Sequence, residues 1–182
     1  MTDLTGRTVL IAGATSASGL AAARTLTSAG ARVVATGRHA EKLVPLAALG
    51  AHTETVDLAD ERAVLDLSRR LHDRGWSIDG VLHLVGGWRC GGGLAGQTEE
   101  DYRVLETSFS ALRHLSRAFD DDLRASPAGR LAIVSATAVN RPLAGGANYA
   151  AARSGSPASR ADFAYPCATA RVHASLAAFT AA

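Results

Sequence analysis

Short apolar runs alternate with helical segments along the first 135 residues of this 182-residue chain. Most of the apolar runs are continuous rather than alternating with polar residues, which is typical of strands buried on both faces. Strands are predicted over residues 8–12, 32–36, 53–56, 80–85 and 131–135, and helices over 20–29, 40–49, 60–71 and 98–123. This order predicts an α/β fold, a doubly wound parallel sheet with helices on both faces.

Two of the predicted helices carry clear start signals. Asp60 is a plausible N-cap, and four apolar residues after it fall on one helical face: Ala63, Val64, Leu67 and Leu71. Thr98 precedes Glu99, Glu100 and Asp101, and the helix dipole favours acidic residues in a first turn.

Composition and charge exclude several classes of protein. The chain is 47% hydrophobic, enough for a core, and its nineteen basic and seventeen acidic residues form no basic block, so we expect no nucleic-acid partner. No apolar run approaches a membrane span and the N-terminus has no signal sequence, so we expect a cytoplasmic protein without a membrane partner. Cys90 and Cys167 lack metal-ligand spacing, so no metal site is expected. A homo-oligomer is left open.

A glycine-containing turn lies between the first predicted strand and the first helix. In a dinucleotide-binding fold this turn presents backbone N–H groups at the helix start to a pyrophosphate, and small residues let the backbone approach. The alternative is an ordinary tight turn. The candidate cofactor-binding residues are Gly13, Thr15, Ser16, Ala17, Ser18 and Gly19.

From this turn onward the chain resembles the short-chain dehydrogenase/reductase family. Gly13 and Gly19 match the family's Thr-Gly-x-x-x-Gly-x-Gly turn, with Ala12 in place of the threonine and Ala17 in place of the middle glycine. The resemblance runs from about Leu4 to Arg153. It implies a Rossmann-like sheet of strand order 3-2-1-4-5 and binding of a nicotinamide dinucleotide.

The resemblance assigns further residues to the cofactor. Asp57 and Leu58 follow the third strand, where the family meets the adenine ring; a turn-forming or helix-capping aspartate is the alternative. Val85, Gly86 and Gly87 stand where the family has Asn-Ala-Gly, close to the cofactor.

The end of the second predicted strand indicates which dinucleotide is bound. The segment 35–38 reads Ala-Thr-Gly-Arg and contains no acid for the ribose 2′-OH of NAD. Arg38 is suited to a 2′-phosphate, so NADP(H) is favoured over NAD(H); the alternative is a solvated loop arginine.

The family's catalytic residues have partial counterparts. Tyr149 matches the family tyrosine that gives or takes a proton, and Arg153 replaces the lysine four residues later. Arg153 retains a charge that favours tyrosinate but differs in shape from an ammonium. Ser135 is the candidate for the substrate-orienting serine, and Ser108 stands at the position of an asparagine that anchors a water. The expected reaction is hydride transfer to or from a small carbonyl or alcohol substrate.

The resemblance ends after Arg153. We expect a dinucleotide-binding domain over residues 1–153 and an atypical tail over residues 154–182, with the family's C-terminal strands missing and the fifth strand left as an open edge. Residues 168–181 are predicted to be helical where ordered. One hypothesis is that the tail is an out-of-frame or truncated read. The alternative function is therefore a catalytically weak or inactive dinucleotide-binding protein that lacks the substrate half.

Overall fold

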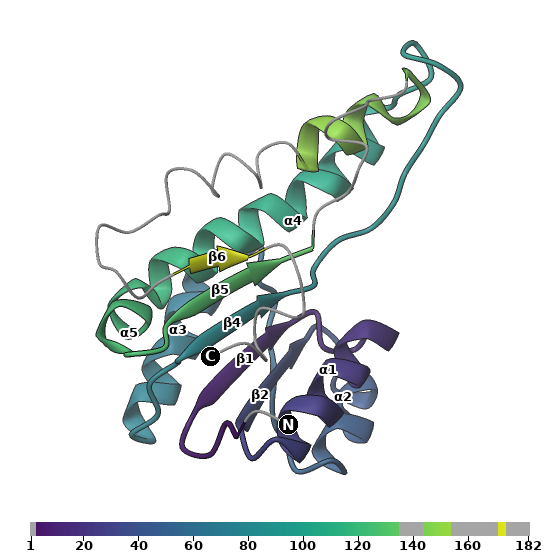
Figure 1. Cartoon of the computed structure of the whole chain (residues 1–182). Helices are drawn as coiled ribbons and strands as arrows, with labels where there is room; N and C mark the ends of the chain where they lie inside the picture. Colours follow the sequence, from purple (N-terminus) through teal and green to yellow (C-terminus); the bar gives the residue numbers. More distant parts are fainter. Residues whose placement is uncertain (1–2, 135–143, 154–170, 174–182) are drawn as a thin grey trace.

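A six-stranded parallel sheet runs through the molecule in the order β3-β2-β1-β4-β5-β6. The computed structural model describes residues 3–134, 144–153 and 171–173. The chain adds β2 and β3 on one side of β1 and β4 and β5 on the other, so the strand order reverses beside β1 (Figure 1). In sheets of this kind, ligands bind outside the carboxyl ends of the strands at that reversal.

From β1 to β5 the elements follow the order predicted from the sequence, except that α5 is a separate helix. The strands are β1 (Thr8–Ala12), β2 (Arg32–Gly37), β3 (His52–Thr55), β4 (Gly80–His83), β5 (Arg130–Ile133) and β6 (Arg171–His173). The helices are α1 (Ala17–Ser28), α2 (Ala40–Ala47), α3 (Glu61–Asp73), α4 (Glu99–Ala118) and α5 (Asp120–Ala125), and residues 147–153 are also helical after a 3-10 turn at Ala144–Gly146.

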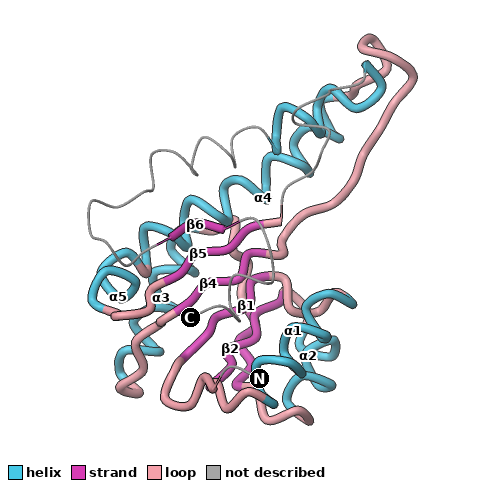
Figure 2. The backbone as a smooth tube through the Cα atoms, viewed as in Figure 1, coloured by secondary structure: helices cyan, strands magenta, loops and turns pink. Residues whose placement is uncertain are grey.

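Helices cover the sheet from both sides, as expected of a doubly wound fold (Figure 2). Successive residues of β1 point to opposite faces, so Leu10 packs with residues of α3 and α4, including Leu67 and Leu115. Ile11 belongs to the second apolar cluster, with Leu26 of α1. The fold class and the order 3-2-1-4-5 of the first five strands are therefore confirmed.

Two helices begin at the predicted N-caps, whereas one helix ends earlier than predicted. The Asp60 side chain accepts hydrogen bonds from the N–H groups of Arg62 and Ala63, and the Thr98 side chain accepts one from Asp101 N–H. The predicted helix over 98–123 is wrong in length: α4 ends at Ala118, and α5 follows the non-helical Phe119, whose ψ is 15°.

The edge of the sheet corrects two expectations about the tail. β6 pairs in parallel with β5, in a register that places Arg171 beside Arg130 and His173 beside Ala132. The fifth strand is therefore not an open edge, and the tail contributes one strand beyond the five predicted. The predicted helix over 168–181 is wrong at residues 171–173, and the remainder of that segment lies outside the described residues.

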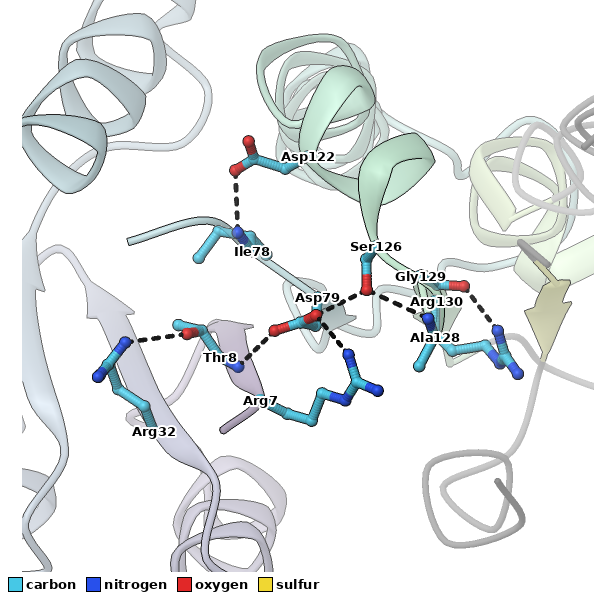
Figure 3. A network of polar contacts seen from close by, with 10 residues as sticks. All are labelled: Arg7, Thr8, Arg32, Ile78, Asp79, Asp122, Ser126, Ala128, Gly129 and Arg130. Atoms are coloured by element: carbon cyan, nitrogen blue, oxygen red, sulfur yellow. Dashed lines mark hydrogen bonds and ion pairs between the residues drawn. The ribbon is translucent and has the colours of Figure 1, made fainter. Parts of the chain in front are cut away.

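Asp79, which directly precedes β4, joins the amino ends of three central strands through its side chain and its backbone carbonyl (Figure 3). One carboxylate oxygen accepts a hydrogen bond from Thr8 N–H at 2.8 Å, and the other accepts from Ser126 Oγ at 2.6 Å and from Arg7 Nη1 at 3.1 Å. The Asp79 carbonyl accepts from Arg130 N–H at 3.0 Å. Because these donors come from the starts of β1 and β5, Asp79 fixes where both strands begin relative to β4.

Replacing Asp79 with asparagine tests this role. Asp79→Asn removes the charge and turns an N–H₂ group toward donors, so we expect a loss of about 2 kcal/mol in the free energy of unfolding, as for charge-assisted hydrogen bonds. Urea unfolding measures the loss. The matched control is Asp73→Asn at the exposed end of α3, which should leave the unfolding midpoint unchanged. Equal stability of the two variants would contradict the assignment.

Candidate functional site

A cavity of about 500 Å³ lies at the carboxyl ends of β1, β2 and β4, beside α4. Its wall contains ten of the residues selected from the sequence: Gly13, Thr15, Ser16, Arg38, Asp57, Leu58, Val85, Gly86, Gly87 and Ser108. The cavity is therefore at the strand-order reversal, where the topology places a ligand site.

The turn after β1 is shaped by close approaches of backbone to backbone. Gly13 has a φ of +78°, and a Cβ there would lie 3.0 Å from the backbone nitrogen of Val85. A side chain at this position would thus be strained and would press on the chain leaving β4. The Ser16 side chain accepts a hydrogen bond from Gly19 N–H at 3.0 Å and begins α1 at Ala17, three residues earlier than predicted.

Three residues of this turn do not line the cavity: Ala17, Ser18 and Gly19. A Cβ at Gly19 would lie 2.6 Å from the Cα of Ala14, so this glycine lets the first turn of α1 pack on the strand end. No acidic residue occupies the first turn of α1. Its unpaired backbone N–H groups are of the kind that attract anions at helix starts.

Two positive charges lie in the cavity wall after β2: Arg38 directly follows the strand, and Lys42 lies in the first turn of α2. Both side chains are exposed, and neither forms an ion pair within the part of the chain that the structure describes. Sequence reasoning found Arg38 but missed Lys42. The available signal was that Lys42 is the chain's single lysine, placed in the first turn of α2.

Asp57 satisfies parts of both readings proposed for it. Its carboxylate accepts a hydrogen bond from Ala59 N–H at 3.0 Å, as a turn-forming aspartate does. The residue also lines the cavity, together with Leu58.

Tyr149 and Arg153 lie on the helical residues 147–153, outside the residues that line the cavity. The Arg153 guanidinium lies over the Tyr149 ring, 5.5 Å from the ring centre, and its Nη1 donates to the carbonyl of Val134 at 3.1 Å. Ser108 lines the cavity and donates its hydroxyl to the Leu105 carbonyl, one turn earlier in α4. Ser135 lies outside the described residues.

The start of the Tyr149 helix is bound to the loop between β4 and α4, which extends beyond the sheet (Figure 1). Gln97 accepts a hydrogen bond from Asn148 N–H at 3.2 Å and donates to the Gly145 carbonyl at 2.9 Å. Gly91 N–H donates to the same carbonyl at 2.9 Å. The glycine-rich loop thus helps to place the residues just before Tyr149, a contact that the sequence did not predict.

His83, the last residue of β4, is a buried polar residue that sequence reasoning treated only as part of an apolar run. It is 3% exposed, and its Nδ1 has no hydrogen-bond partner. Burial, with a smaller contribution from the positive charge of Arg153, lowers the pKa of His83 to about 4. The imidazole is therefore neutral at pH 7.

Other kinds of site receive no support from the described part of the chain. No group of three or more potential metal-ligating side chains occurs among these residues. None of the helices in the same residues is long and apolar enough to span a membrane.

Sheet order, glycine turn and cavity together define the Rossmann-like class of α/β proteins. The family model described as short chain dehydrogenase matches residues 7–178. The chain belongs to this family, and the resemblance noted in the sequence is confirmed.

Two curated relatives are named as ketoreductases. The chain is 43% identical over 91 residues to the "Putative daunorubicin C-13 ketoreductase DnrU" of Streptomyces sp. (strain C5), covering 46% of this chain and 32% of that protein. It is 28% identical over 165 residues to the "Monensin polyketide synthase putative ketoacyl reductase" of Streptomyces virginiae, covering 85% of this chain and 62% of that protein. The matches thus cover less than two thirds of either relative.

Solved structures of the family share the fold at low sequence identity. A short-chain dehydrogenase from Streptomyces avermitilis has a TM-score of 0.85 at 23% identity, covering 92% of this chain and 64% of that chain. An NADPH-bound short chain oxidoreductase from Pseudomonas aeruginosa PAO1, described as containing an atypical catalytic center, has a TM-score of 0.83 at 23% identity, covering 91% and 67%. A short chain dehydrogenase from Shigella flexneri complexed with NADP has a TM-score of 0.83 at 24% identity, covering 90% and 74%.

The lowered pKa of His83 predicts an acid-sensitive fold. As pH falls from about 6.5 toward 4, the unfolded chain binds a proton on this residue that the folded chain does not bind, so unfolding becomes more favourable. The expected loss is up to about 3 kcal/mol of unfolding free energy by pH 4, at about 1.4 kcal/mol per pH unit. His83→Leu should flatten this decline.

Urea unfolding at several pH values between 7 and 4 measures the effect. His39→Leu, at an exposed position, is the control and should decline as the wild type does. A His83→Leu variant with the wild-type decline would show that His83 is not the residue responsible.

Proposed function

We propose that the chain binds NADP(H) in the cavity at the carboxyl ends of β1, β2 and β4, and catalyses oxidation or reduction of a small alcohol or carbonyl compound. Family membership supports oxidoreductase chemistry. The NADP-bound relatives from P. aeruginosa and S. flexneri support the choice of dinucleotide.

The pair of cations that follows β2, Arg38 and Lys42, is the observation that carries the cofactor proposal. Arg38 and Lys42 both line the cavity. Between the glycine turn and Lys42 the only acidic residue that could bind a ribose 2′-OH is Glu41, which is exposed and does not line the cavity. A 2′-phosphate would gain charge-assisted hydrogen bonds there. The glycine turn fits the rest of the cofactor because Gly13 and the start of α1 leave room and N–H groups for a pyrophosphate.

Tyr149 is the residue proposed to transfer the proton. When bound, NADP(H) supplies or accepts the hydride, and the substrate oxygen then needs a proton donor or acceptor within hydrogen-bond reach. Arg153, over the Tyr149 ring, keeps a positive charge next to this residue. Ser108, in the cavity wall, is proposed to anchor a water, and Ser135 is proposed to orient the substrate oxygen.

The second candidate is a dinucleotide-binding protein with little or no turnover. The identity of residue 153 favours it, because a guanidinium does not release its proton and a relay through this side chain is therefore excluded. Binding and turnover measurements separate the two candidates.

Arg38→Ala tests the choice of dinucleotide. Loss of a charged contact to the 2′-phosphate should weaken NADPH binding by about 1.5–3 kcal/mol and leave NADH binding nearly unchanged. Isothermal titration calorimetry with both dinucleotides measures the difference. The control Arg24→Ala removes an exposed arginine of α1 that does not line the cavity, and should change neither affinity. An equal loss for both dinucleotides, or no loss, would remove Arg38 from the site.

Tyr149→Phe tests whether the chain turns over. The variant keeps the ring under Arg153 and lacks the hydroxyl, so NADPH affinity should be retained while carbonyl-dependent NADPH oxidation falls by about 10²-fold or more. A panel of small ketones and aldehydes, followed at the NADPH absorbance, provides the assay. Wild-type protein that binds NADPH but oxidises it with no member of the panel would support the second candidate. Activity unaffected in the variant would exclude Tyr149 as the proton donor.

A further inference from the structure

Gly86 and the guanidinium of Arg153 are in direct contact. A Cβ built on Gly86 would lie 3.0 Å from Arg153 Cζ and 3.3 Å from Nη1, and nearer still to Nη2. Real Cβ atoms essentially never come within 3.0 Å of another side chain, so the guanidinium occupies the space of the missing methyl group. Gly86 lines the cavity and Arg153 does not, so this cation lies directly behind a residue of the cavity wall.

We propose that Gly86 is a positioning residue, whose missing side chain provides the seat in which the Arg153 guanidinium is held beside the cavity and Tyr149. This inference rests on the proposed function for its catalytic meaning, whereas the seat itself is a property of the chain alone. The consequence is that a side chain at position 86 and an arginine in this seat at position 153 exclude one another.

Three contacts define the seat. The guanidinium packs against the Gly86 backbone, donates to the Val134 carbonyl at 3.1 Å and lies over the Tyr149 ring. These contacts link the end of β5, the chain that leaves β4 and the Tyr149 helix. A planar guanidinium can make all three at once, whereas a lysine ammonium is a compact group on a flexible stem.

A methyl group at position 86 would displace the cation rather than disrupt the fold. The atoms it meets are the far end of a flexible side chain, which can swing away at little cost in stability. The displaced guanidinium would lose its bond to Val134 and its place over Tyr149. Gly86→Ala is thus expected to move a charge while leaving the thermal midpoint close to that of the wild type.

His83 provides a reporter of that charge in the protein without cofactor. The Arg153 charge contributes to the lowered pKa of His83, after burial. When the guanidinium leaves its seat, the pKa of His83 should rise toward its ordinary value. NMR titration of the imidazole signals measures this change without any reference to activity.

The test is a double-mutant cycle in three backgrounds at position 153. Gly86→Ala is introduced into the wild type, Arg153→Met and Arg153→Lys, and the pKa of His83 and the affinity for NADPH are measured in each. Gly92→Ala is the matched control, because it adds the same methyl group in the same loop where no atom lies within 4 Å.

We expect Gly86→Ala to raise the pKa of His83 when residue 153 is arginine. It should also weaken NADPH binding about tenfold in that background, because a positive charge moves away from the neighbourhood of an anionic cofactor. The same substitution should have little effect on either quantity with methionine or lysine at 153. Gly92→Ala should have none.

Two results would overturn the inference. One is a Gly86→Ala variant with the wild-type pKa at His83. The other is an equal effect of the methyl group in all backgrounds, which would mean that it obstructs the cavity directly. If the wild type binds no NADPH, the proposed function fails, but the His83 titrations still decide whether the seat exists.

Discussion

A single carboxylate at the amino edge of the sheet sets the alignment on which the opposite edge depends. Asp79 binds the first residue of β1 and the residue before it, and its backbone binds the first residue of β5. Because the strands are parallel and short, fixing where they start also fixes where they end. Gly13 and Val85 are therefore placed against one another at the far edge, where both residues line the cavity.

At that far edge the chain departs from its family in ways that are physically related. A glycine at 86, where the family has alanine, accompanies an arginine at 153, where the family has lysine. Because the two residues are in contact, the two differences from the family are physically coupled: the glycine leaves the space that the arginine occupies. His83, whose pKa is lowered mainly by burial, is neutral at pH 7 and adds no second positive charge to that of Arg153. The site thus retains one fixed charge beside Tyr149.

The alternation of apolar runs and helical faces was sufficient to predict the sheet, because burial on both faces leaves a strong signal in strands such as 8–12. Local caps at Asp60 and Thr98 were predictable because each uses its own side chain within three residues. β6 was not predictable from the sequence. It has three residues, two of which are Arg171 and His173, so it carries no strand pattern. It pairs with the edge that β5 presents. The position of Lys42 in the cavity wall and the contacts of Gln97 were missed because they depend on tertiary placement. What was predicted for residues 154–182 stays a prediction, except at residues 171–173.

The Asp79 contacts also say something about how the molecule is made. Asp79 lies 71 positions along the chain from its partner Thr8 and 47 positions from its partner Ser126. In such a parallel arrangement, β1 can pair with β2 early, but it stays open on its other side until β4 has been synthesised. Closing these long loops has an entropic cost before the contacts form, which slows folding of chains dominated by distant pairings. The first strand of the chain, at the middle of the sheet, therefore has both of its neighbours only after β4 has been made.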